Sequence, residues 1–284
     1  MAREWYLRVI ALTCRRLQRF PGRWRVVSWA LRQVRRHGAA IGVRRVRTAH
    51  GFLVDCDLAD WIGQYVYVTG SYEEPTIALL PALVRNGDSV VDVGANIGFY
   101  TLRLAQLVGP AGRVTAFEPM PYALERIHAN LQLNGASQVT VVACAASDTD
   151  AIVELFLGPP EHTSIASIAP REGARTVTVR CRPLDQALAA GGRIALLKID
   201  AEGVEDRVLA GAQRILSDDS PAIIAEINDT TWPGELMSAG YRMFQIDWDG
   251  LREIRQGAGA ASPGQFNALF LKGDVPEGIR GMVR

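Results

Sequence analysis

The stretch VVDVGANIGFYTLRLA, residues 90–105, constrains the fold more than any other part of the chain. An apolar run typical of a strand ends in a short turn containing Gly94, Asn96 and Gly98, and a helical apolar pattern follows it. A strand that turns tightly into a helix needs glycine where the backbone approaches a ligand or takes a positive φ. The stretch therefore predicts a β/α unit with a ligand at the turn.

The same alternation of strand and helix continues toward the C-terminus. We expect strands at 89–93, 113–118, 138–143, 194–199 and 221–227 and helices at 98–108, 121–133 and 204–216. ELMSAGYRMFQIDWDG predicts a further helix and strand, and QFNALFLKG a last strand. Apolar strands separated by helices indicate a parallel sheet that is covered on both faces.

Two segments depart from this alternation. Before the first of these strands, VRRVRTAHGFLVDCDL predicts a hairpin that turns at His50 and Gly51, and the chain then runs through a loop into a helix after Pro75. Between the third and fourth strands we expect two strands around a loop rich in Pro, Ser and Gly. A short helix starting near Leu184 or Asp185 follows them.

Composition sets the broad class of protein. Of the 284 residues 48% are hydrophobic, which is ordinary for a folded globular chain and argues against a disordered one. The four cysteines lie far apart and form no CxxC pair, so neither a disulfide framework nor a zinc knuckle is expected. This cysteine usage fits a reducing compartment, and we expect a cytoplasmic protein.

Positive charge is concentrated at the N-terminus. Residues 1–50 contain 13 of the 31 Lys and Arg residues and one acidic residue, Glu4, whereas residues 51–284 carry 18 basic and 29 acidic residues, a net charge of −11. WYLRVIALTCRRLQRFPGRWRVVSWALRQVRR predicts two amphipathic helices separated at Pro21 and Gly22. Arginines interrupt its apolar stretches, so we expect neither a membrane span nor a signal peptide.

Three roles for this arm stay open. Its helices can pack on the core, or they can attach the protein to the inner face of an anionic membrane, because tryptophan and arginine on an amphipathic helix suit an interface. Binding of nucleic acid is disfavoured, because the rest of the chain is acidic. We expect residues 1–40 to be dispensable for cofactor binding.

The form of the glycine turn narrows the ligand. DVGANIG is GxNxG and not the GxGxxG dinucleotide pattern, and the phosphate-binding GxxxxGK[ST] loop is absent from the sequence, so a ligand without a pyrophosphate is favoured. Glu118 ends the second strand 24 residues after Gly94, where a carboxylate can accept hydrogen bonds from both hydroxyls of a ribose. Adenosine without a diphosphate indicates S-adenosylmethionine. Asp92 would orient the turn or meet the ammonium of the methionine part.

Six stretches of the chain carry a family resemblance. They are GSYEEP at 70–75, GDSVVDVGANIGFYTLRLA at 87–105, VTAFEPMP at 114–121, NLQLNG at 130–135, AASD at 145–148 and LLKIDAEGVEDRVLAG at 196–211. In this combination the chain resembles the FkbM family of S-adenosylmethionine-dependent methyltransferases, most specifically in KIDAEGVE. The resemblance covers residues 50–272 and leaves out the Arg-rich arm.

The resemblance implies an α/β fold of the Rossmann-like class I methyltransferase type. This fold has a mostly parallel seven-stranded sheet with helices on both faces and ends in an antiparallel hairpin, here with an N-terminal helical arm added. The implied activity is O-methyl transfer to a hydroxyl of a sugar, polyketide or lipid-linked saccharide. Carried over by position, the cofactor residues are Asp92, Gly94, Asn96 and Gly98 on the methionine side, Glu118 at the ribose, and Ala145, Ala146 and Ser147 at the adenine edge.

Carboxylates end two of the expected strands. Asp200 lies at the carboxyl end of a strand, where open α/β sheets bind ligands, and Glu202 follows it. Methyl transfer needs alignment and the removal of a hydroxyl proton, so Asp200, Glu202 or Glu226 is predicted to be the general base. Glu205 is expected to cap a helix, and Lys198 to pair with Asp200.

Further polar residues leave alternatives open. A divalent ion such as Mg²⁺ is compatible with the chain, although a polar substrate pocket is favoured. Its oxygen ligands would be Asp200, Glu226, Asn228 and Asp229. His162 is another candidate for the base, because histidine titrates near neutral pH. Tyr72 and Glu73 either close over the substrate side of the site or pack between the hairpin and the helix.

The sequence thus predicts four parts and one favoured function. The parts are an Arg-rich helical arm at 1–40, a hairpin and helix at 41–86, a methyltransferase core at 87–273 and a tail at 274–284. The favoured acceptor is a small molecule or glycan and not nucleic acid, since no NPPY-type base-holding motif is present. A nucleic acid methyltransferase, an NAD-linked oxidoreductase and a non-catalytic cofactor-binding module are the alternatives.

Overall fold

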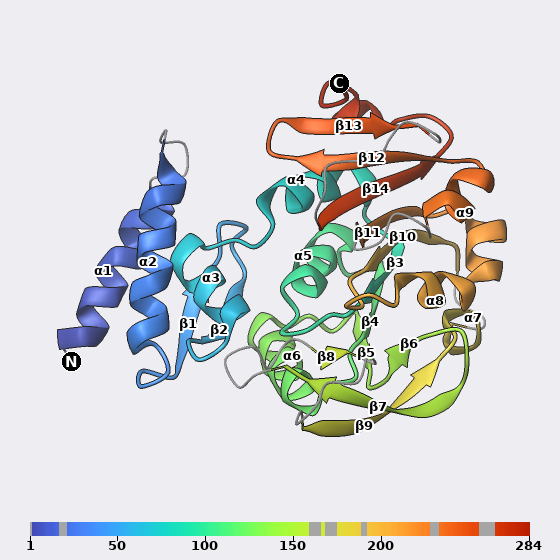
Figure 1. Ribbon diagram of the computed structural model, residues 1–284. Coiled ribbons are helices and arrows are strands. Elements are labelled where there is room, and N and C mark those ends of the chain that lie inside the picture. Colours follow the sequence, from blue (N-terminus) through green and yellow to red (C-terminus); the bar gives the residue numbers. More distant parts are fainter. Residues whose placement is uncertain are drawn as a thin grey trace.

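The computed structural model describes residues 2–16, 22–158, 166–167, 175–188, 192–227, 233–255 and 265–284. A single large sheet forms its centre (Figure 1). The strands of this sheet are β3 (Ser89–Val93), β4 (Arg113–Phe117), β5 (Val139–Val142), β10 (Ile194–Ile199), β11 (Ala222–Ile227), β12 (Tyr241–Asp247), β13 (Gly250–Ile254) and β14 (Phe266–Lys272).

The order of the strands defines the fold class. Across the sheet it is β13-β12-β14-β11-β10-β3-β4-β5. The neighbours from β11 to β5 are parallel, whereas β14 is antiparallel to both β11 and β12. From β3 the next strands, β4 and β5, are added on one side, whereas β10 and β11 are added on the other, so the strand order reverses between β3 and β10. The carboxyl ends of these two strands form the crevice where open α/β sheets bind ligands. The predicted Rossmann-like architecture is confirmed.

The sheet has one strand more than the seven expected. β13 pairs antiparallel with β12 and forms a new edge, in a segment for which the sequence analysis assigned no strand. Gly250 opens this strand with a φ of 126°, and a Cβ there would lie 2.4 Å from the carbonyl oxygen of Met282. A glycine is therefore needed for the reversal that brings β13 back onto the sheet.

Helices cover both faces of the sheet, as expected. One face carries α4 (Glu74–Leu83), α5 (Phe99–Val108), α6 (Pro121–Asn134) and α10 (Glu277–Arg280), and the other carries α7 (Leu184–Ala187), α8 (Glu205–Ala210), the π-helix η2 (Ile215–Asp219) and α9 (Pro233–Ser238). The helix expected at 204–216 is shorter, because Gly211 passes so close to Ser147 that a Cβ would lie 2.0 Å from its carbonyl oxygen. The chain therefore leaves α8 at this point.

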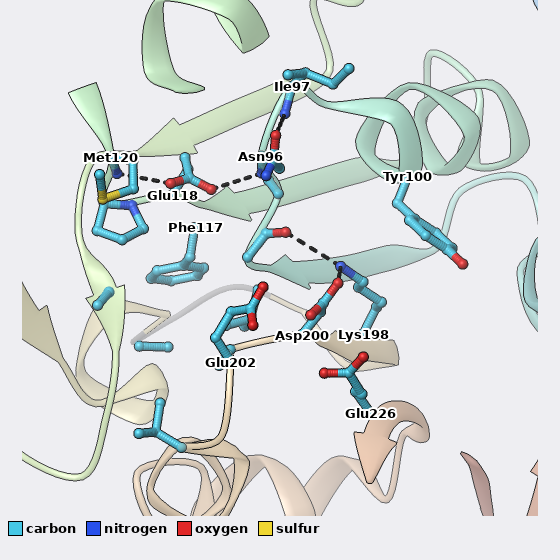
Figure 2. Close-up of a pocket in the computed structure, with 18 of the residues that line it drawn as sticks. Asn96, Ile97, Tyr100, Phe117, Glu118, Met120, Lys198, Asp200, Glu202 and Glu226 are labelled. Atoms are coloured by element: carbon cyan, nitrogen blue, oxygen red, sulfur yellow. Dashed lines mark hydrogen bonds and ion pairs between the residues drawn. The ribbon is translucent and has the colours of Figure 1, made fainter. Parts of the chain in front are cut away.

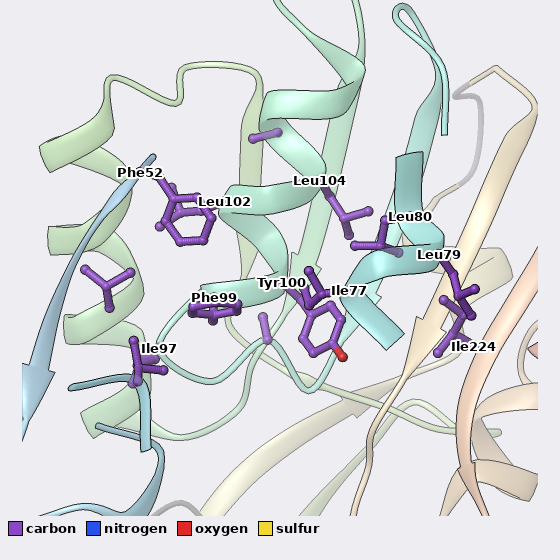
Figure 3. Close-up of a cluster of buried hydrophobic side chains, with 14 of the residues drawn as sticks. Phe52, Ile77, Leu79, Leu80, Ile97, Phe99, Tyr100, Leu102, Leu104 and Ile224 are labelled. Atoms are coloured by element: carbon purple, nitrogen blue, oxygen red, sulfur yellow. The ribbon is translucent and has the colours of Figure 1, made fainter. Parts of the chain in front are cut away.

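Neighbouring residues of each central strand enter different cores. In β10, Leu196 belongs to the cluster under α4 and α5, and Leu197 to the cluster under α8 and α9. Ile223 and Ile224 in β11 divide in the same way, because successive side chains of a strand point to opposite faces. Figure 3 shows the first cluster, where Leu79 of α4 meets Ile224. Burial on both faces explains why these strands read as continuous apolar runs.

A second, smaller sheet follows β5. Its strands are β6 (Ala145–Ala146), β7 (Ala151–Leu157), β8 (Ala166–Ser167) and β9 (Thr176–Arg182), in the order β6-β9-β7-β8. The antiparallel pairing of β7 with β9 confirms the two strands expected around a loop, and α7 confirms the short helix after them. Most of the loop between β7 and β9 lies outside the described residues.

The N-terminal part is a helical layer beside a hairpin. It consists of α1 (Ala2–Arg16), α2 (Arg23–His37), β1 (Val43–Arg47), β2 (Leu53–Asp57) and α3 (Trp61–Thr69). The hairpin and the two arm helices were expected, but α3 replaces a predicted loop. The Asp60 carboxylate accepts the backbone N–H groups of Ile62 and Gly63, and Gly70 ends the helix at a φ of 76°. These are ordinary start and stop signals that the sequence analysis missed.

The arm helices bury one face. Leu7, Ile10 and Cys14 of α1 and Val27 and Val34 of α2 are buried, and α1 contacts both α2 and α3. The apolar face of the arm is therefore part of the same core as the hairpin. Among the described residues, no helix is long and apolar enough to cross a membrane. The domain boundaries proposed from the sequence stay predictions.

Two asparagines of the NLQLNG stretch attach the hairpin to α6. Asn134 accepts the N–H of Leu53 at 2.8 Å and donates to the Leu53 carbonyl at 2.7 Å. Asn130 is fully buried, accepts the N–H of Asp55 at 2.8 Å and donates to the Ile97 carbonyl at 2.8 Å. Asn130 thus joins β2, α6 and the glycine turn after β3.

We predict that Asn130→Ala lowers the free energy of unfolding by about 3 kcal/mol, because it leaves the N–H of Asp55 and the carbonyl of Ile97 buried without partners. Asn134→Ala is the matched control. Asn134 is half-buried and makes no contact with the turn, so its removal should cost about 1 kcal/mol. Urea unfolding of both variants measures the difference, and equal losses would contradict the bridging role of Asn130.

Candidate active site

A cavity of about 330 Å³ opens at the carboxyl ends of β3, β4 and β10 (Figure 2). It brings together ten of the residues predicted to form the site. They are Tyr72, Gly94, Asn96, Glu118, Ala145, Ala146, Ser147, Asp200, Glu202 and Glu226. The residues come from both halves of the sheet and are far apart in the sequence. They lie together because the parallel strands end at the same edge of the sheet.

The glycine turn brings the ends of β3 and β10 into contact. Gly94 has a φ of 72°, and a Cβ on it would lie 1.8 Å from the carbonyl oxygen of Asp200. Any other residue would collide with backbone there, and backbone cannot move aside as the end of a side chain can. The N–H groups of Gly94 and Ala95 donate to the carbonyl of Phe117, which ties the turn to the end of β4 as well.

Glu118 is held by this turn. Its Oε2 accepts the backbone N–H of Asn96 at 2.7 Å and its Oε1 accepts that of Met120 at 2.8 Å. Burial raises the pKa of the Glu118 carboxyl to about 7, against the lowering effect of these two N–H groups. Each carboxylate oxygen has a second lone pair, so Glu118 can still accept hydrogen bonds from a ligand in the cavity.

Lys198 places a buried positive charge under the turn. Its Nζ lies 3.4 Å from Oδ1 of Asp92, 3.5 Å from Oδ2 of Asp200 and 3.4 Å from the carbonyl oxygen of Gly94. Burial by itself lowers the pKa of Lys198, but the carboxylates of Asp200, Asp92 and Glu73 outweigh it and raise the pKa above its usual value. Lys198 is therefore an ammonium, and the predicted pairing of Lys198 with Asp200 is present.

Asp92 lies beneath the cavity and does not line it. Its side chain is fully buried, and its Oδ2 accepts the Thr101 hydroxyl at 2.6 Å. Oδ2 thus has a hydrogen-bond partner in Thr101, whereas Oδ1 has the ion pair with Lys198 and no hydrogen bond, so Asp92 anchors the ammonium beneath the turn. Gly98 also lies off the cavity, at the start of α5, where a Cβ would meet Ile127 at 2.8 Å.

Three carboxylates gather on the side of the cavity opposite Glu118. Figure 2 shows Glu202, Asp200 and Glu226 on this side, and of the three Asp200 is paired with the ammonium of Lys198. Glu202 stands at the rim, where burial of its inner side and the like charges of Asp200 and Glu226 raise its pKa to about 7. Glu205, which was expected to cap the helix, is buried at the first residue of α8 and instead accepts the N–H groups of Ala201 and Gly203 in the preceding turn.

Tyr72 and Glu73 stand at the entrance to the site. Tyr72 lines the cavity, whereas Glu73 turns away from it and accepts the Tyr100 hydroxyl at 2.7 Å and the Asn267 side-chain amide at 2.9 Å. Glu73 joins α4, α5 and β14 at this point. Burial raises the pKa of the Glu73 carboxyl.

Backbone strain is concentrated around the cavity. Among the described residues four that are not glycine have a positive φ, and three of them surround the site: Glu73 at 44°, Asn96 at 49° and Glu202 at 55°. Non-glycine residues in this region cost about 1–3 kcal/mol each and persist where the surroundings fix them. This pattern is typical of a functional site.

Some predictions fall outside the described residues. These are His162 as a base and Asn228 and Asp229 as metal ligands. In the part of the chain that the structure describes, no group of three or more His, Cys, Asp or Glu side chains is arranged to hold a metal ion. Conversely, the sequence analysis missed Tyr100 and Trp61 as lining residues. Tyr100 lies two residues after Gly98 on the first turn of α5, which was a usable signal.

Fold and site together define a class I methyltransferase. Residues 92–252 match the methyltransferase FkbM domain, which is more than half of the chain. The chain belongs to the FkbM methyltransferase family.

Several known proteins are similar to this chain. AMB antimetabolite synthetase AmbE of Pseudomonas aeruginosa is 35% identical over 158 residues, covering 55% of this chain and 7% of AmbE. The 31-O-demethyl-FK506 methyltransferase FkbM of Streptomyces tacrolimicus is 30% identical over 178 residues, covering 51% of this chain and 67% of that protein. The crystal structure of methyltransferase FkbM from Methylobacillus flagellatus KT shares 20% identity with a TM-score of 0.46, covering 73% of this chain and 52% of that one.

We predict that cofactor affinity depends on pH through Glu118, the residue expected at the ribose. Ribose hydroxyls donate to the carboxylate form, so a protonated Glu118 must lose its proton on binding. We predict constant affinity above the pKa of about 7 and a loss of up to about tenfold for each pH unit below it. Calorimetric titration with S-adenosylhomocysteine between about pH 5.5 and 8.5 measures this dependence.

Two variants test the assignment. Glu118→Gln should bind more weakly at neutral pH and lose the pH dependence, and Glu118→Ala should lose about 1–3 kcal/mol of binding free energy. Glu125→Gln is the control, because Glu125 is exposed on α6 and does not line the cavity. Equal affinity of the unaltered protein at about pH 6 and pH 8 would remove Glu118 from the cofactor site.

Proposed function

We propose that the protein transfers a methyl group from S-adenosylmethionine to a hydroxyl oxygen of a small molecule or glycan. The observation that carries the proposal is the arrangement of one cavity: Glu118 lies on one side, and Glu202, Glu226 and Asp200, which is paired with the buried Lys198 ammonium, lie on the other. In methyl transfer the acceptor hydroxyl must lie between the methyl donor and the base that takes its proton. The donor and the base therefore have to lie on opposite sides of one small cavity.

The residues present fit S-adenosylmethionine. Gly94 has no side chain, so a ligand can approach the backbone at the end of β3. Glu118 presents a carboxylate suited to a ribose diol. Ala145, Ala146 and Ser147 line the same cavity with small side chains, which leaves room for a flat ring. Bound S-adenosylmethionine would supply a methyl group carried on a positively charged sulfur. The carboxylates of Asp200 and Glu202 favour that charge by electrostatic attraction.

Glu202 is the proposed general base. A base is most effective when its pKa lies near the working pH, and the pKa of Glu202 is about 7. Glu202 takes the proton of the acceptor hydroxyl while the acceptor oxygen gains the methyl group. Asp200 is paired with Lys198 and has the positioning role, since it fixes the end of β10 next to Glu202.

The name of one relative supports oxygen as the acceptor atom. The Streptomyces tacrolimicus protein is named for 31-O-demethyl-FK506, so its own acceptor atom is an oxygen. The shared family makes oxygen the first choice for this chain as well. Screening hydroxylated small molecules and glycans with isotopically labelled S-adenosylmethionine tests the proposal, and label found only in nucleic acid or protein would overturn it.

We predict that Glu202→Gln lowers kcat by about 10²-fold at saturating cofactor, because general base catalysis contributes at least this factor. In the unaltered enzyme kcat should rise with pH up to the pKa of about 7, since the base acts when deprotonated, and Glu202→Gln should abolish that rise. Saturation with cofactor removes the contribution of Glu118, which acts on affinity.

Two further variants separate the carboxylates. Asp200→Asn should retain much of the fold and also lower kcat by about 10²-fold, because it removes the pairing with Lys198 that positions Glu202, but unlike Glu202→Gln it should keep the rise of kcat with pH. Asp206→Asn is the control, because Asp206 is exposed on α8 and does not line the cavity. Normal turnover in both Glu202→Gln and Asp200→Asn would shift the base to Glu226 or His162.

A further inference from the structure

A second cavity adjoins the first and lies outside the proposed cofactor site. It is an open groove of about 500 Å³ between the start of α2, α3, the beginning of α4 and the turn from β12 to β13. Trp61, Tyr72 and Gln265 line both cavities. The groove therefore adjoins the cavity that holds the carboxylates, with these three side chains at the boundary.

Aromatic side chains form the walls of the groove. Trp24 and Trp248 meet edge to face with ring centroids 5.0 Å apart, and Trp61, Tyr65 and Tyr72 continue the series at 5.9 and 5.8 Å. Trp24 is 40% exposed and Trp248 56% exposed. Large aromatic surfaces left open to solvent in a concave site are typical of ligand contacts.

The side chain of Arg23 holds the pair of Trp24 and Trp248 in place. The Arg23 guanidinium lies 4.9 Å from the Trp24 ring centre and 5.7 Å from that of Trp248, and it pairs with Glu74 at the start of α4. A cation that lies over an aromatic ring attracts the ring. The Arg23–Glu74 ion pair that fixes this cation is largely buried. The stacking surface is therefore preorganised, although Trp24 and Trp248 lie at opposite ends of the chain.

The polar groups of the groove select against phosphate. None of the described residues that line it is basic, and two, Glu73 and Asp247, are acidic. A nucleic acid or sugar phosphate would meet this surface without a cationic partner. The Gln265 amide can donate to and accept from hydroxyls, the Asn267 oxygen can accept, and the Gln245 NH₂ group can donate. The NH₂ group of Asn267 already bonds Glu73 and Thr76, and the oxygen of Gln245 accepts from Arg252.

We propose that this groove binds the acceptor as an uncharged saccharide ring, whose apolar face stacks on Trp24 and Trp248 and whose hydroxyls contact the amides. The proposal rests on the proposed methyl transfer to a hydroxyl. It makes the arm helix α2 part of the acceptor site and leaves the cofactor residues untouched.

Saturation-transfer NMR with methyl glycosides of glucose, galactose, mannose and rhamnose tests the groove, with glucose 6-phosphate as the charged comparison. At least one methyl glycoside should bind better than the phosphate. Trp24→Ala and Trp248→Ala should each weaken its binding about tenfold, and Trp248→Tyr should restore most of it. Trp29→Ala is the matched control, because Trp29 lies exposed on the same helix but does not line the groove.

The outcomes separate the two proposals. S-adenosylhomocysteine affinity should be the same in all these variants. If no glycoside binds, if the phosphate binds better, or if the Trp24 and Trp248 variants bind normally, the saccharide groove is wrong, while cofactor binding and transfer to another hydroxyl still support the function. If instead the unaltered protein binds a glycoside but transfers no methyl group to any hydroxyl compound, the proposed function is wrong.

The outer face of α1 carries a second and independent feature. Trp5, Val9 and Leu12 recur at the spacing of one helix face and are exposed, with Trp5 at 69%. Arg8 and Arg16 are exposed one turn on either side of Leu12. The one acidic residue of the arm, Glu4, is paired with Arg44. This exposed face is therefore apolar and basic at once.

We infer that this face of α1 rests on an anionic lipid surface, because apolar side chains and arginines on one helix face suit an interface of that charge. Sedimentation with vesicles tests the inference, using phosphatidylcholine alone and phosphatidylcholine mixed with an equal amount of phosphatidylglycerol. The protein should pellet with the mixed vesicles, and salt should release it.

Trp5→Ala combined with Leu12→Ala should weaken vesicle binding about tenfold or more. Ile152→Ala is the control, since Ile152 is exposed on β7 in the small sheet. Absence of vesicle binding, or equal binding to both kinds of vesicle, would overturn the inference. So would a dimer in sedimentation equilibrium that the Trp5 and Leu12 substitutions dissociate, because a second copy would then cover the face.

Discussion

The buried ammonium of Lys198 is the interaction on which the rest of the site depends. A charge in the interior is costly unless it is paired and hydrogen-bonded, so Lys198 requires Asp92 and Asp200 at the distances observed, 3.4 and 3.5 Å. The parallel register already places Lys198 opposite Asp92, and the missing side chain of Gly94 lets the end of β10 come close enough for Asp200 to follow. The strand ends, the glycine turn and the carboxylates of Asp92 and Asp200 are thus held together around one buried ammonium.

Much of the fold and of the cofactor side could be predicted because their signals are local. The apolar runs of β3, β10 and β11 and the glycines of the first turn are properties of neighbouring residues, and parallel strands bring their ends to one edge whatever the loops do. Glu118 could be found for the same reason, since it ends the strand next to the turn. The NLQLNG stretch was noticed as part of a resemblance, and Asn130 gives it a physical role in joining the hairpin to that turn.

The remainder depends on contacts between distant parts of the chain. Glu73 meets Asn267 across the fold, and Trp24 meets Trp248; no periodicity or spacing links such pairs. The expected arm was basic and amphipathic, yet nothing in its own sequence says that the first turn of α2 borders the groove. The eighth strand and α3 were different cases. Their signals, Gly250 and Asp60, were present, but a short apolar segment reads equally well as strand, helix or loop until its partners are known.

The extra strand β13 has a consequence for how such an enzyme can diversify. It forms the outer edge of the sheet and carries Trp248 in the turn that leads to it, on the far side of β14 from the cofactor residues. Changes in the length or residues of this hairpin can alter the aromatic surface without disturbing Gly94, Glu118 or Lys198. On the assignments proposed here, acceptor recognition and methyl transfer lie on separable pieces of one sheet, so that new specificities can arise at its margin while its centre stays fixed.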